Sequence, residues 1–282
     1  MSKSIHASQT ALVTGGASGL GRAASLLFAS EGARVCVADL DGPGAEKVAQ
    51  EIRDSGGEAV AFTGDVSTPE ANDAMVATTL EAFGTLDIAY LNAGIARGST
   101  IRGGNLDVWD QVIAVDLRSV FLGLRAVVEP MVTAGGGSIV CTASVAGLRG
   151  GANMPSYFAA KHGVVGLVKS AAVEFAPLNI RVNAVCPGVI DTPILGPAHG
   201  VEAITNLLGK GHLLDRVGQP GEVAQLVSFL ASDRSSFVTG VAYPVDGGMT
   251  AALGAGDRSD MDEETSQRLF EQLSSGVPEK GK

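Results

Sequence analysis

The chain has 282 residues, of which 45% are hydrophobic and 18% are charged, a balance typical of a globular protein that excludes a disordered one. It carries 30 acidic residues against 20 basic ones, and the resulting net charge of −10 offers no basic face to a nucleic acid. No run approaches the ~18 apolar residues of a membrane span, and residues 1–10 are too polar for a secretory signal. We therefore expect neither a nucleic-acid nor a membrane partner.

The cysteines and histidines argue for a reducing compartment and against a metal site. Three cysteines lie in or beside short apolar runs: Cys36, Cys141 and Cys186. Their odd number and buried setting favour reduced core thiols over disulfides. His162, His199 and His212 show no metal-ligand spacing. We expect a cytoplasmic protein without a bound metal.

Short apolar runs alternate with longer helical patterns from Thr10 to about Val245. The short runs are rich in Val, Ile and Ala and end in turn residues, which predicts buried strands. These strands are expected at 10–14, 33–39, 58–65, 86–94, 138–144, 180–188 and 240–246. Helices are expected near 19–31, 44–55, 69–82, 106–133, 156–177 and 220–231. The alternation predicts a single α/β, doubly wound domain, with a mostly parallel seven-stranded sheet and helices on both faces.

The residues after about Leu253 have a different composition. They are polar and acidic, with one helical candidate from Met261 to Leu273. We expect a catalytic domain over residues 1–253 and an acidic C-terminal extension over 254–282. The extension is either a frayed tail or a helix that packs on a neighbouring subunit or over the mouth of the active site.

A glycine-rich turn follows the first predicted strand and opens the first predicted helix. In the run from Thr14 to Gly21, the residues Gly15, Gly19 and Gly21 allow the backbone to turn tightly and to approach a pyrophosphate. The helix that follows directs its free N–H groups and the positive end of its dipole to the same place. This strand–turn–helix context predicts a nucleotide-binding site.

An acidic residue follows the second predicted strand and indicates which nucleotide binds. Asp39 lies 39 − 21 = 18 residues after the last glycine of the turn. A carboxylate there accepts hydrogen bonds from the ribose hydroxyls of an adenosine and repels a 2′-phosphate. Ser18 is neutral where a phosphate would want a cation, and Arg22 and Arg34 do not replace that charge. We therefore expect NAD rather than NADP.

Tyr157 and Lys161 carry the candidate chemistry. Four residues apart, they share one face of a predicted helix and direct a phenol and an ammonium at the same volume. A free tyrosine, with a pKa near ~10, is a poor acid or base at neutral pH, and a nearby cation favours the phenolate. Ser144 lies upstream and adds a hydroxyl to the set.

Together these residues resemble the short-chain dehydrogenase/reductase family, over residues 10 to about 250. Further motifs of the family follow in order: Asp65-Val66, Asn92-Ala93-Gly94, Pro187-Gly188 with Thr192, and Asp246-Gly247-Gly248. Leu91 stands where the family often has another asparagine. The resemblance implies a Rossmann-like fold. Members of the family commonly form homotetramers through the helices that hold residues 116 and 157, so we expect a homotetramer here.

The resemblance also implies roles for the site residues. Tyr157 exchanges a proton with the substrate oxygen, Lys161 promotes this and binds the nicotinamide ribose, and Ser144 hydrogen-bonds the substrate oxygen. The implied cofactor-binding residues are Gly15, Ser18, Gly19, Leu20, Gly21, Asp39, Asp65, Val66, Asn92, Ala93, Gly94, Tyr157, Lys161, Pro187, Gly188, Val189, Ile190 and Thr192. The expected cofactor is NAD, which carries the hydride.

Asp116 departs from the family pattern. The family usually has an asparagine at this position of the long central helix, where it is thought to hold a helix distortion whose backbone carbonyl binds a water leading to the lysine. We count Asp116 with the catalytic residues. If the backbone alone matters, the aspartate serves equally well, whereas a carboxylate near Lys161 would stabilise the ammonium and weaken its effect on Tyr157.

The substrate is less well determined by the sequence. Two segments should border it, 149–155 and 195–214, and the second contains several Leu and Ile residues that suggest a mobile, mostly apolar lid. We expect NAD-dependent interconversion of a secondary alcohol and a ketone of modest polarity, including cyclic ones.

Two other functions stay open. One is a 3-oxoacyl-thioester reductase of fatty-acid synthesis. The residues Met154, Pro155 and Ser156 before Tyr157 differ from the run common in that group, and Asp39 disfavours the NADPH that such reductases usually take. The other is a non-catalytic NAD-binding regulator, against which the intact set of Ser144, Tyr157 and Lys161 argues.

Overall fold

The structure is a computed structural model that describes residues 4–198 and 202–251. The chain divides into two units, Met1–Thr250 and Ala251–Lys282. The first unit holds all the elements described below. The acidic extension and its expected helix at 261–273 lie outside the described residues, so the domain boundary at 253 stays a prediction.

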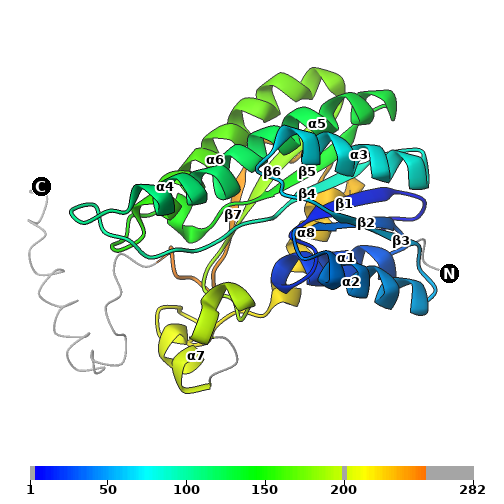
Figure 1. The fold of residues 1–282 in the computed structure, drawn as a ribbon. Coiled ribbons are helices and arrows are strands. Elements are labelled where there is room, and N and C mark those ends of the chain that lie inside the picture. The colour runs from blue at the N-terminus through cyan, green and yellow to red at the C-terminus, as the bar shows by residue number, and fades with distance from the viewer. Residues whose placement is uncertain (1–3, 199–201, 252–282) are drawn as a thin grey trace, which may run out of the picture. The chain divides into compact units, whose positions relative to one another are not determined.

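Seven strands form one sheet in the order β3-β2-β1-β4-β5-β6-β7 (Figure 1). The strands are β1 (Thr10–Thr14), β2 (Arg34–Asp39), β3 (Ala59–Thr63), β4 (Ile88–Leu91), β5 (Gly137–Thr142), β6 (Ile180–Pro187) and β7 (Ala242–Val245). Every pairing in this sheet is parallel. The expected α/β doubly wound architecture is therefore confirmed.

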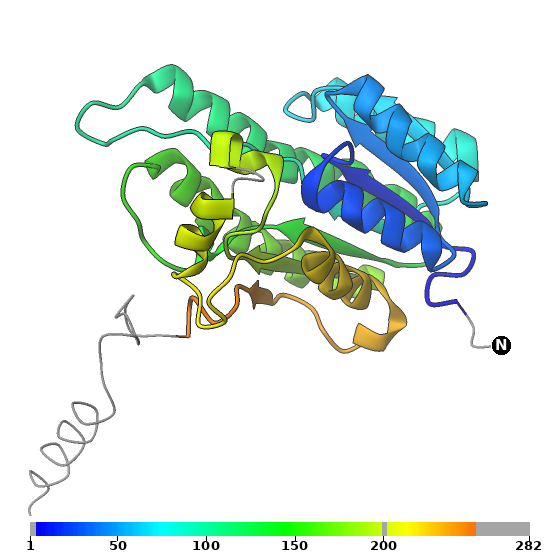
Figure 2. The same ribbon diagram turned by 90° about the horizontal axis from the view of Figure 1, so that it is seen from below.

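Helices cover both faces of the sheet (Figures 1 and 2). One apolar core lies under α3 (Pro69–Phe83), α5 (Ser119–Thr133) and α6 (Pro155–Phe175). A second core lies under α1 (Gly19–Ser30), α2 (Gly42–Asp54) and α8 (Pro220–Ala231). Because both faces are covered, β1 and β4 are buried along their whole length, which is why they are continuous apolar runs in the sequence.

The order of the strands places a crevice at the centre of the sheet. From β1 the chain first builds outward through β2 and β3, and then returns to add β4 on the other side of β1. The connections that leave the carboxyl ends of β1 and β4 therefore run in opposite directions. In open parallel sheets, ligands bind at this point.

The long central helix is interrupted, as the family resemblance implied for this region. The helix expected over 106–133 consists of α4 (Leu106–Ile113), a π-helical segment over Ala114–Arg118 and then α5. Asp116 lies within the π-helical segment and is buried. Such segments widen the helix by one residue and are frequent at functional sites.

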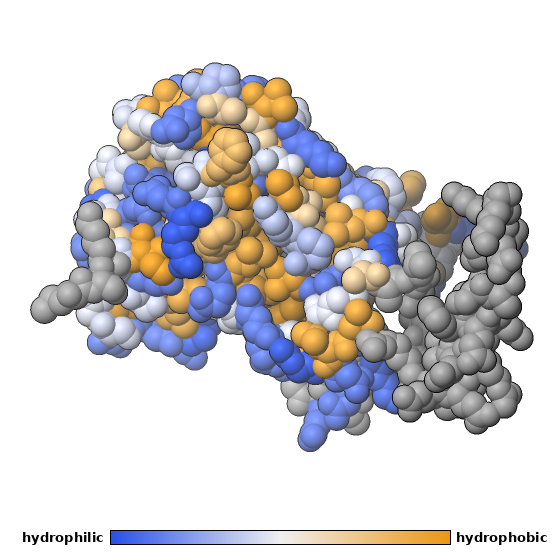
Figure 3. Space-filling model, turned by 180° about the vertical axis from the view of Figure 1, so that it is seen from behind, coloured by the Kyte–Doolittle hydropathy of each residue, from blue (hydrophilic) through white to orange (hydrophobic). Residues whose placement is uncertain are grey.

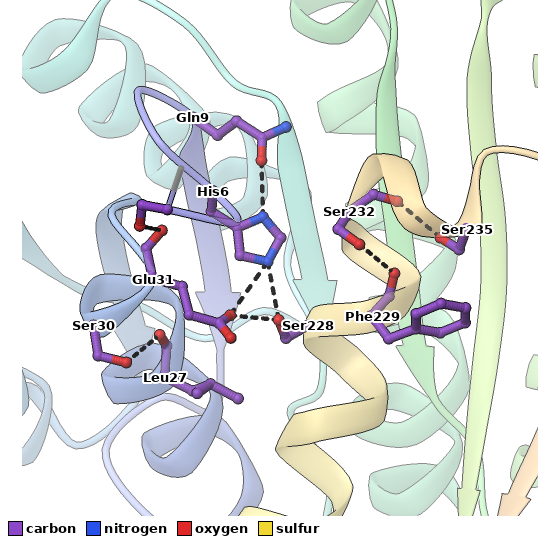
Figure 4. A network of polar contacts seen from close by, with 10 residues as sticks. His6, Gln9, Leu27, Ser30, Glu31, Ser228, Phe229, Ser232 and Ser235 are labelled. Carbon is purple, nitrogen blue, oxygen red and sulfur yellow. Dashed lines mark hydrogen bonds and ion pairs between the residues drawn. The ribbon is translucent and has the colours of Figure 1, made fainter. Parts of the chain in front are cut away.

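A buried histidine joins the N-terminal segment to two helices (Figure 4). The His6 Nδ1 atom lies 2.8 Å from Gln9 Oε1, and its Nε2 atom lies 3.1 Å from Ser228 Oγ of α8. The Ser228 hydroxyl in turn donates to the carboxylate of Glu31, which follows α1. This network ties residues 6–9 to α8 and to the end of α1, next to the amino end of β1.

Some apolar side chains remain on the surface, and on the face shown in Figure 3 they gather over the middle, between hydrophilic ones. Among the described residues, Val173 and Phe237 are strongly exposed. An apolar groove also lies between the π-helical segment, α5 and α6. Within the described ranges, no helix is both long enough and apolar enough to cross a membrane.

Candidate active site

The glycine-rich turn has the conformation that the sequence predicts. Gly15 and Gly19 have positive φ values of 66° and 50°, which L side chains rarely adopt. A Cβ atom on Gly15 would lie 3.0 Å from the backbone of Ala93, and one on Gly21 would overlap the carbonyl oxygen of Gly15. Helix α1 begins at Gly19, and the side chain of Ser18 makes no capping hydrogen bond. The first N–H groups of α1 therefore stay available to an anion.

Asp39 at the end of β2 supports the turn. One carboxylate oxygen accepts from the Ala17 N–H at 2.9 Å, and the other accepts from the Asp41 N–H at 2.9 Å. Arg22, the arginine nearest to the glycine-rich turn in sequence, forms an ion pair with Glu51 at 2.6 Å. The turn therefore has a carboxylate on one side and a neutralised arginine on the other.

A cavity of about 550 Å³ lies along the carboxyl ends of the strands. It is lined by most of the expected cofactor-binding residues: Gly15, Ser18, Gly19, Leu20, Asp39, Asp65, Val66, Asn92, Ala93, Gly94 and Thr192. The cavity is also lined by Arg97, Gln111 and Ile194, which carry no motif and were not predicted from the sequence. The glycine cradle, the acceptor at Asp39 and the helix N-terminus suit the phosphates and ribose of a dinucleotide.

Asn92 links three strand ends beside this cavity. Its side-chain amide donates to the Thr14 carbonyl at 3.0 Å, and its side-chain oxygen accepts from the Thr142 hydroxyl at 3.0 Å. The backbone N–H of Asn92 also donates to the Thr14 hydroxyl at 2.8 Å. These bonds join the ends of β1, β4 and β5 and so stabilise the centre of the sheet beside the cavity.

The structure brings the three expected catalytic side chains to this edge of the sheet. Tyr157 and Lys161 lie on α6, and the Lys161 Nζ atom is 5.4 Å from the centre of the Tyr157 ring. Ser144 follows β5 and is buried, with its oxygen accepting from the Ala146 N–H at 3.1 Å. That bond leaves the hydroxyl hydrogen of Ser144 able to donate to a substrate.

Lys161 is almost completely buried and pairs with a carboxylate. Its ammonium donates to the Thr142 carbonyl at 3.1 Å and lies 3.1 Å from Asp116 Oδ2. The exposed fraction is 3% for Lys161 and 0% for Asp116. Burial alone lowers the pKa of Lys161, but the charges of Asp116 and Tyr157 outweigh it, so the net pKa is raised.

Asp116 reaches Lys161 because of the backbone around it. Its Oδ1 atom accepts from the Ile95 N–H at 2.8 Å, which anchors the carboxylate to the segment after β4. Its Oδ2 atom has no aligned hydrogen-bond donor, so the contact with Lys161 is an ion pair rather than a directed bond. A Cβ atom on Gly94 would lie 3.2 Å from Oδ2, so glycine leaves room for the pair.

Of the other expected cofactor-binding residues, Pro187 ends β6, and Gly188, Val189 and Ile190 follow it. Val189 and Ile190 line a neighbouring cavity of about 280 Å³, together with His212 and Asp246. Asp246 accepts hydrogen bonds from the Gly248 N–H at 3.0 Å and the Thr250 N–H at 2.8 Å, which closes the turn of the Asp246-Gly247-Gly248 motif. From the sequence, His212 lies in the segment 195–214 that is expected to border the substrate and shows no metal-ligand spacing, but its burial cannot be inferred from spacing.

Comparison with known proteins identifies the family of this chain. The sequence profile of the family described as Enoyl-(Acyl carrier protein) reductase matches residues 15–250. The chain belongs to the short-chain dehydrogenase/reductase family. It is therefore an oxidoreductase of a family that uses a nicotinamide cofactor.

Several relatives of this short-chain dehydrogenase/reductase are similar over most of their length. Cyclohexanol dehydrogenase of Acinetobacter sp. (strain SE19) is 43% identical over 244 residues, which are 86% of this chain and 95% of that protein. The 3-oxoacyl-(acyl-carrier-protein) reductase of Chlamydia trachomatis is 38% identical over 242 residues, 86% of this chain and 97% of that one. The crystal structure of levodione reductase matches with a TM-score of 0.83 at 37% identity, covering 88% of this chain and 99% of that one.

This chain departs from the usual pattern of the family at two positions, Leu91 and Asp116. Leu91 is buried against α5, and a Cβ atom on Gly123 would lie 2.8 Å from its side chain. Asp116 lies in the π-helical segment, and its carboxylate contacts Lys161 directly. Among the described residues, no group of three His, Cys, Asp or Glu side chains could hold a metal ion. His199 lies outside the described ranges.

Proposed function

We propose that this protein is an NAD-dependent oxidoreductase that interconverts a secondary alcohol and a ketone, with cyclic compounds as its substrate class. The observation that carries the proposal is the pairing of Tyr157 with the buried Lys161 ammonium at the edge of the sheet where the nucleotide cavity opens. Ser144 completes the set with a hydroxyl that is free to donate.

The chain's own residues hold and move the proton. In oxidation, the Tyr157 oxygen takes the proton of the substrate hydroxyl, and in reduction it returns a proton to the carbonyl oxygen. The ammonium of Lys161 favours the phenolate, and the Ser144 hydroxyl stabilises negative charge on the substrate oxygen. When bound, the nicotinamide cofactor supplies or accepts the hydride.

NAD is the cofactor that the charges around the turn favour. Asp39 presents acceptors for ribose hydroxyls, and its carboxylate repels a 2′-phosphate. Arg22 is already paired with Glu51 and Ser18 is neutral, so neither supplies the cation that a 2′-phosphate needs. The choice of NAD over NADP rests on these three positions.

The substrate class rests on the relatives and on the walls of the cavity. The names of two relatives, cyclohexanol dehydrogenase and levodione reductase, denote an alcohol and a ketone as substrates. In this chain, Ile95, Val115 and Ile194 give the cavity an apolar side. A ring of modest polarity suits such a wall.

A 3-oxoacyl-thioester reductase is the second candidate, and the 38% identity to the Chlamydia trachomatis reductase favours it. Asp39 argues against the NADPH that such enzymes usually take, and the Met154-Pro155-Ser156 run differs from theirs. A non-catalytic regulator receives the least support, because Ser144, Tyr157 and Lys161 are all present and Lys161 lies beside the Tyr157 ring.

We further propose a cytoplasmic homotetramer. The apolar groove that would join copies is lined by Ile113, Leu117, Phe121, Gly163, Gly166 and Leu167. The three cysteines, all free and buried, suit a reducing compartment. The native mass measured by light scattering decides the number of copies.

The deciding experiment is an absorbance assay at the reduced-nicotinamide band. The purified protein is given cyclohexanol, cyclohexanone, a linear secondary alcohol and a 3-oxoacyl thioester, first with the NAD couple and then with the NADP couple. We expect turnover of the cyclic pair with NAD. Faster turnover of the thioester with NADPH would replace the proposal with the second candidate. Absence of any change with all four compounds would contradict the proposed substrate class and favour the regulator.

A further inference from the structure

The backbone after β6 is held by hydrogen bonds at three of four successive N–H groups. The Gly188 N–H donates to the Val245 carbonyl at 3.0 Å, and the Asp191 N–H donates to the Gly218 carbonyl at 2.9 Å. The Val189 N–H donates instead to a side chain, the Nε2 atom of His212, at 3.1 Å. Among the described residues, the Ile190 N–H has no partner. His212 is therefore the side chain that fixes this segment.

The contacts of His212 determine which of its two ring nitrogens carries the hydrogen. The ring is buried, with an exposed fraction of 5%. Because Nε2 accepts from the Val189 N–H, it carries no hydrogen, and the hydrogen must lie on Nδ1. Nδ1 lies 3.1 Å from the Gly209 carbonyl, which can only accept. The two partners thus select one neutral tautomer.

Two glycines form the slot that holds this imidazole. A Cβ atom on Gly188 would lie 2.7 Å from the His212 Nε2 atom, too close for any other residue. Gly247 also borders the side chain: it has a φ of 54°, and a Cβ atom there would lie 3.2 Å from the Cβ of His212. Gly188 and Gly247, which belong to two different motifs, therefore leave the space that the His212 ring occupies.

The segment fixed by His212 leads directly to the nucleotide cavity. Thr192 lines that cavity and packs against the glycine-rich turn, since a Cβ atom on Gly19 would lie 3.2 Å from its methyl group. At its other end, His212 bonds to Gly209, the last residue of α7 (Glu202–Gly209). The imidazole thus joins the segment expected to be a lid to the wall of the cofactor site.

We propose that His212 is a positioning residue that fixes Val189 and Ile190 for the nicotinamide end of the cofactor. The inference rests on the proposed function and on the family resemblance, in which the segment of Pro187-Gly188 and Thr192 holds the nicotinamide and its carboxamide. Without the acceptor on His212, the half-buried Val189 N–H loses its only protein partner among the described residues, and the segment shifts. The adenosine end, held at Gly15 and Asp39, is not affected.

The test compares two ligands on a matched pair of variants. Isothermal titration calorimetry measures the binding of NAD⁺ and of ADP-ribose, which lacks the nicotinamide ring. In H212N, the amide nitrogen replaces Nδ1 and keeps the contact with Gly209, but no acceptor reaches Val189. In H212Q, the amide oxygen replaces Nε2 and keeps that acceptor. His162 is exposed on α6, so H162Q serves as the control.

We expect H212N to weaken NAD⁺ binding about tenfold or more while the dissociation constant of ADP-ribose changes less than about twofold. H212Q should stay within about threefold of the wild type for both ligands. Thermal melting checks that each variant folds. If H212N does not fold, G188A, whose new methyl displaces the ring, should show the same selective loss.

Two results would overturn the inference while leaving the proposed function intact: unchanged NAD⁺ binding in H212N and G188A, or an equal loss for NAD⁺ and ADP-ribose. The second result would show that His212 only stabilises the fold. Wild-type protein that binds neither ligand would instead remove the proposed function itself.

Discussion

The Asp116 carboxylate lies 3.1 Å from the Lys161 ammonium, and both side chains are buried. The cation beside Tyr157 is therefore half of an ion pair, with its partner on the π-helical segment of the central helix. At an effective dielectric constant of about 20, charges ~4 Å apart interact by about 4 kcal/mol. The carboxylate holds the lysine charged, and at the same time offsets part of its field at the phenol.

Replacing Asp116 with asparagine should move the pH profile. The carboxylate raises the pKa of Lys161, while burial lowers it. Without the carboxylate the burial effect remains, so the pKa of Lys161 falls and the ammonium is lost at a lower pH. We expect the alkaline limb of kcat to shift to lower pH, with kcat at the optimum changed less than about tenfold, or ~1.4 kcal/mol. Asp110 is exposed on α4, and D110N is the matched control. If the alkaline limb of the kcat profile does not move in D116N, the helix distortion and not the carboxylate is what the site requires at this position.

The same substitution should reduce stability. A raised lysine pKa contributes stability that is fully present below the unfolded value, ~10.4, and is lost as pH rises through the folded value. Removing one partner of a buried pair costs about 3–5 kcal/mol. We expect D116N to lower the free energy of unfolding by about this amount at pH 7, measured by urea denaturation, and by less at strongly alkaline pH. Equal stability at pH 7 would contradict the role of the pair.

Replacing Tyr157 with phenylalanine should abolish the proton transfer and weaken NAD⁺ binding only slightly. General acid–base catalysis contributes about 10²–10⁴-fold, so kcat should fall by at least ~100-fold. The dissociation constant of NAD⁺ should change little, because the ring is retained. Tyr243 on β7 is partly exposed, and Y243F is the control. A Y157F variant that keeps its rate would exclude tyrosine as the acid and base.

Asp39 should determine the choice of cofactor. In D39N the repulsion of a 2′-phosphate is removed, while one acceptor oxygen remains for the turn. We expect the ratio of kcat/KM for NAD to kcat/KM for NADP to fall about tenfold or more. Asp41 caps α2, and asparagine caps a helix equally well, so D41N should leave the ratio unchanged. A wild-type preference for NADP would overturn the assignment.

Gly21 should not tolerate a side chain. The Cβ atom of alanine would overlap the Gly15 carbonyl oxygen, which is backbone and cannot move without opening the turn. We expect G21A to lose measurable NAD⁺ binding in calorimetry and to melt at a lower temperature. Gly221 in the first turn of α8 has no neighbour within 4 Å of a new Cβ atom, so G221A should bind normally. Normal binding by G21A would refute the close approach.

The sequence predicted the element order and the motifs at the strand ends because these features are local. Each strand is a short apolar run buried on both faces. The glycines and the carboxylate of the cofactor turn stand at a recognisable spacing along the chain, although Asp39 contacts Ala17 across 22 residues. Asn92 could be located by its motif, but its bonds to Thr14 and Thr142 join three strands and require the sheet.

What the chain determined by itself is the parallel sheet, the dinucleotide turn and the Tyr157–Lys161 pair, since periodicity and spacing along one chain specify them. Only the tertiary structure decided that Asp116 reaches Lys161 across two helices, and that His212 meets Val189 in a slot between two glycines. Both contacts join residues distant in sequence. Their geometry depends on helix packing and on a positive φ, which local patterns do not encode.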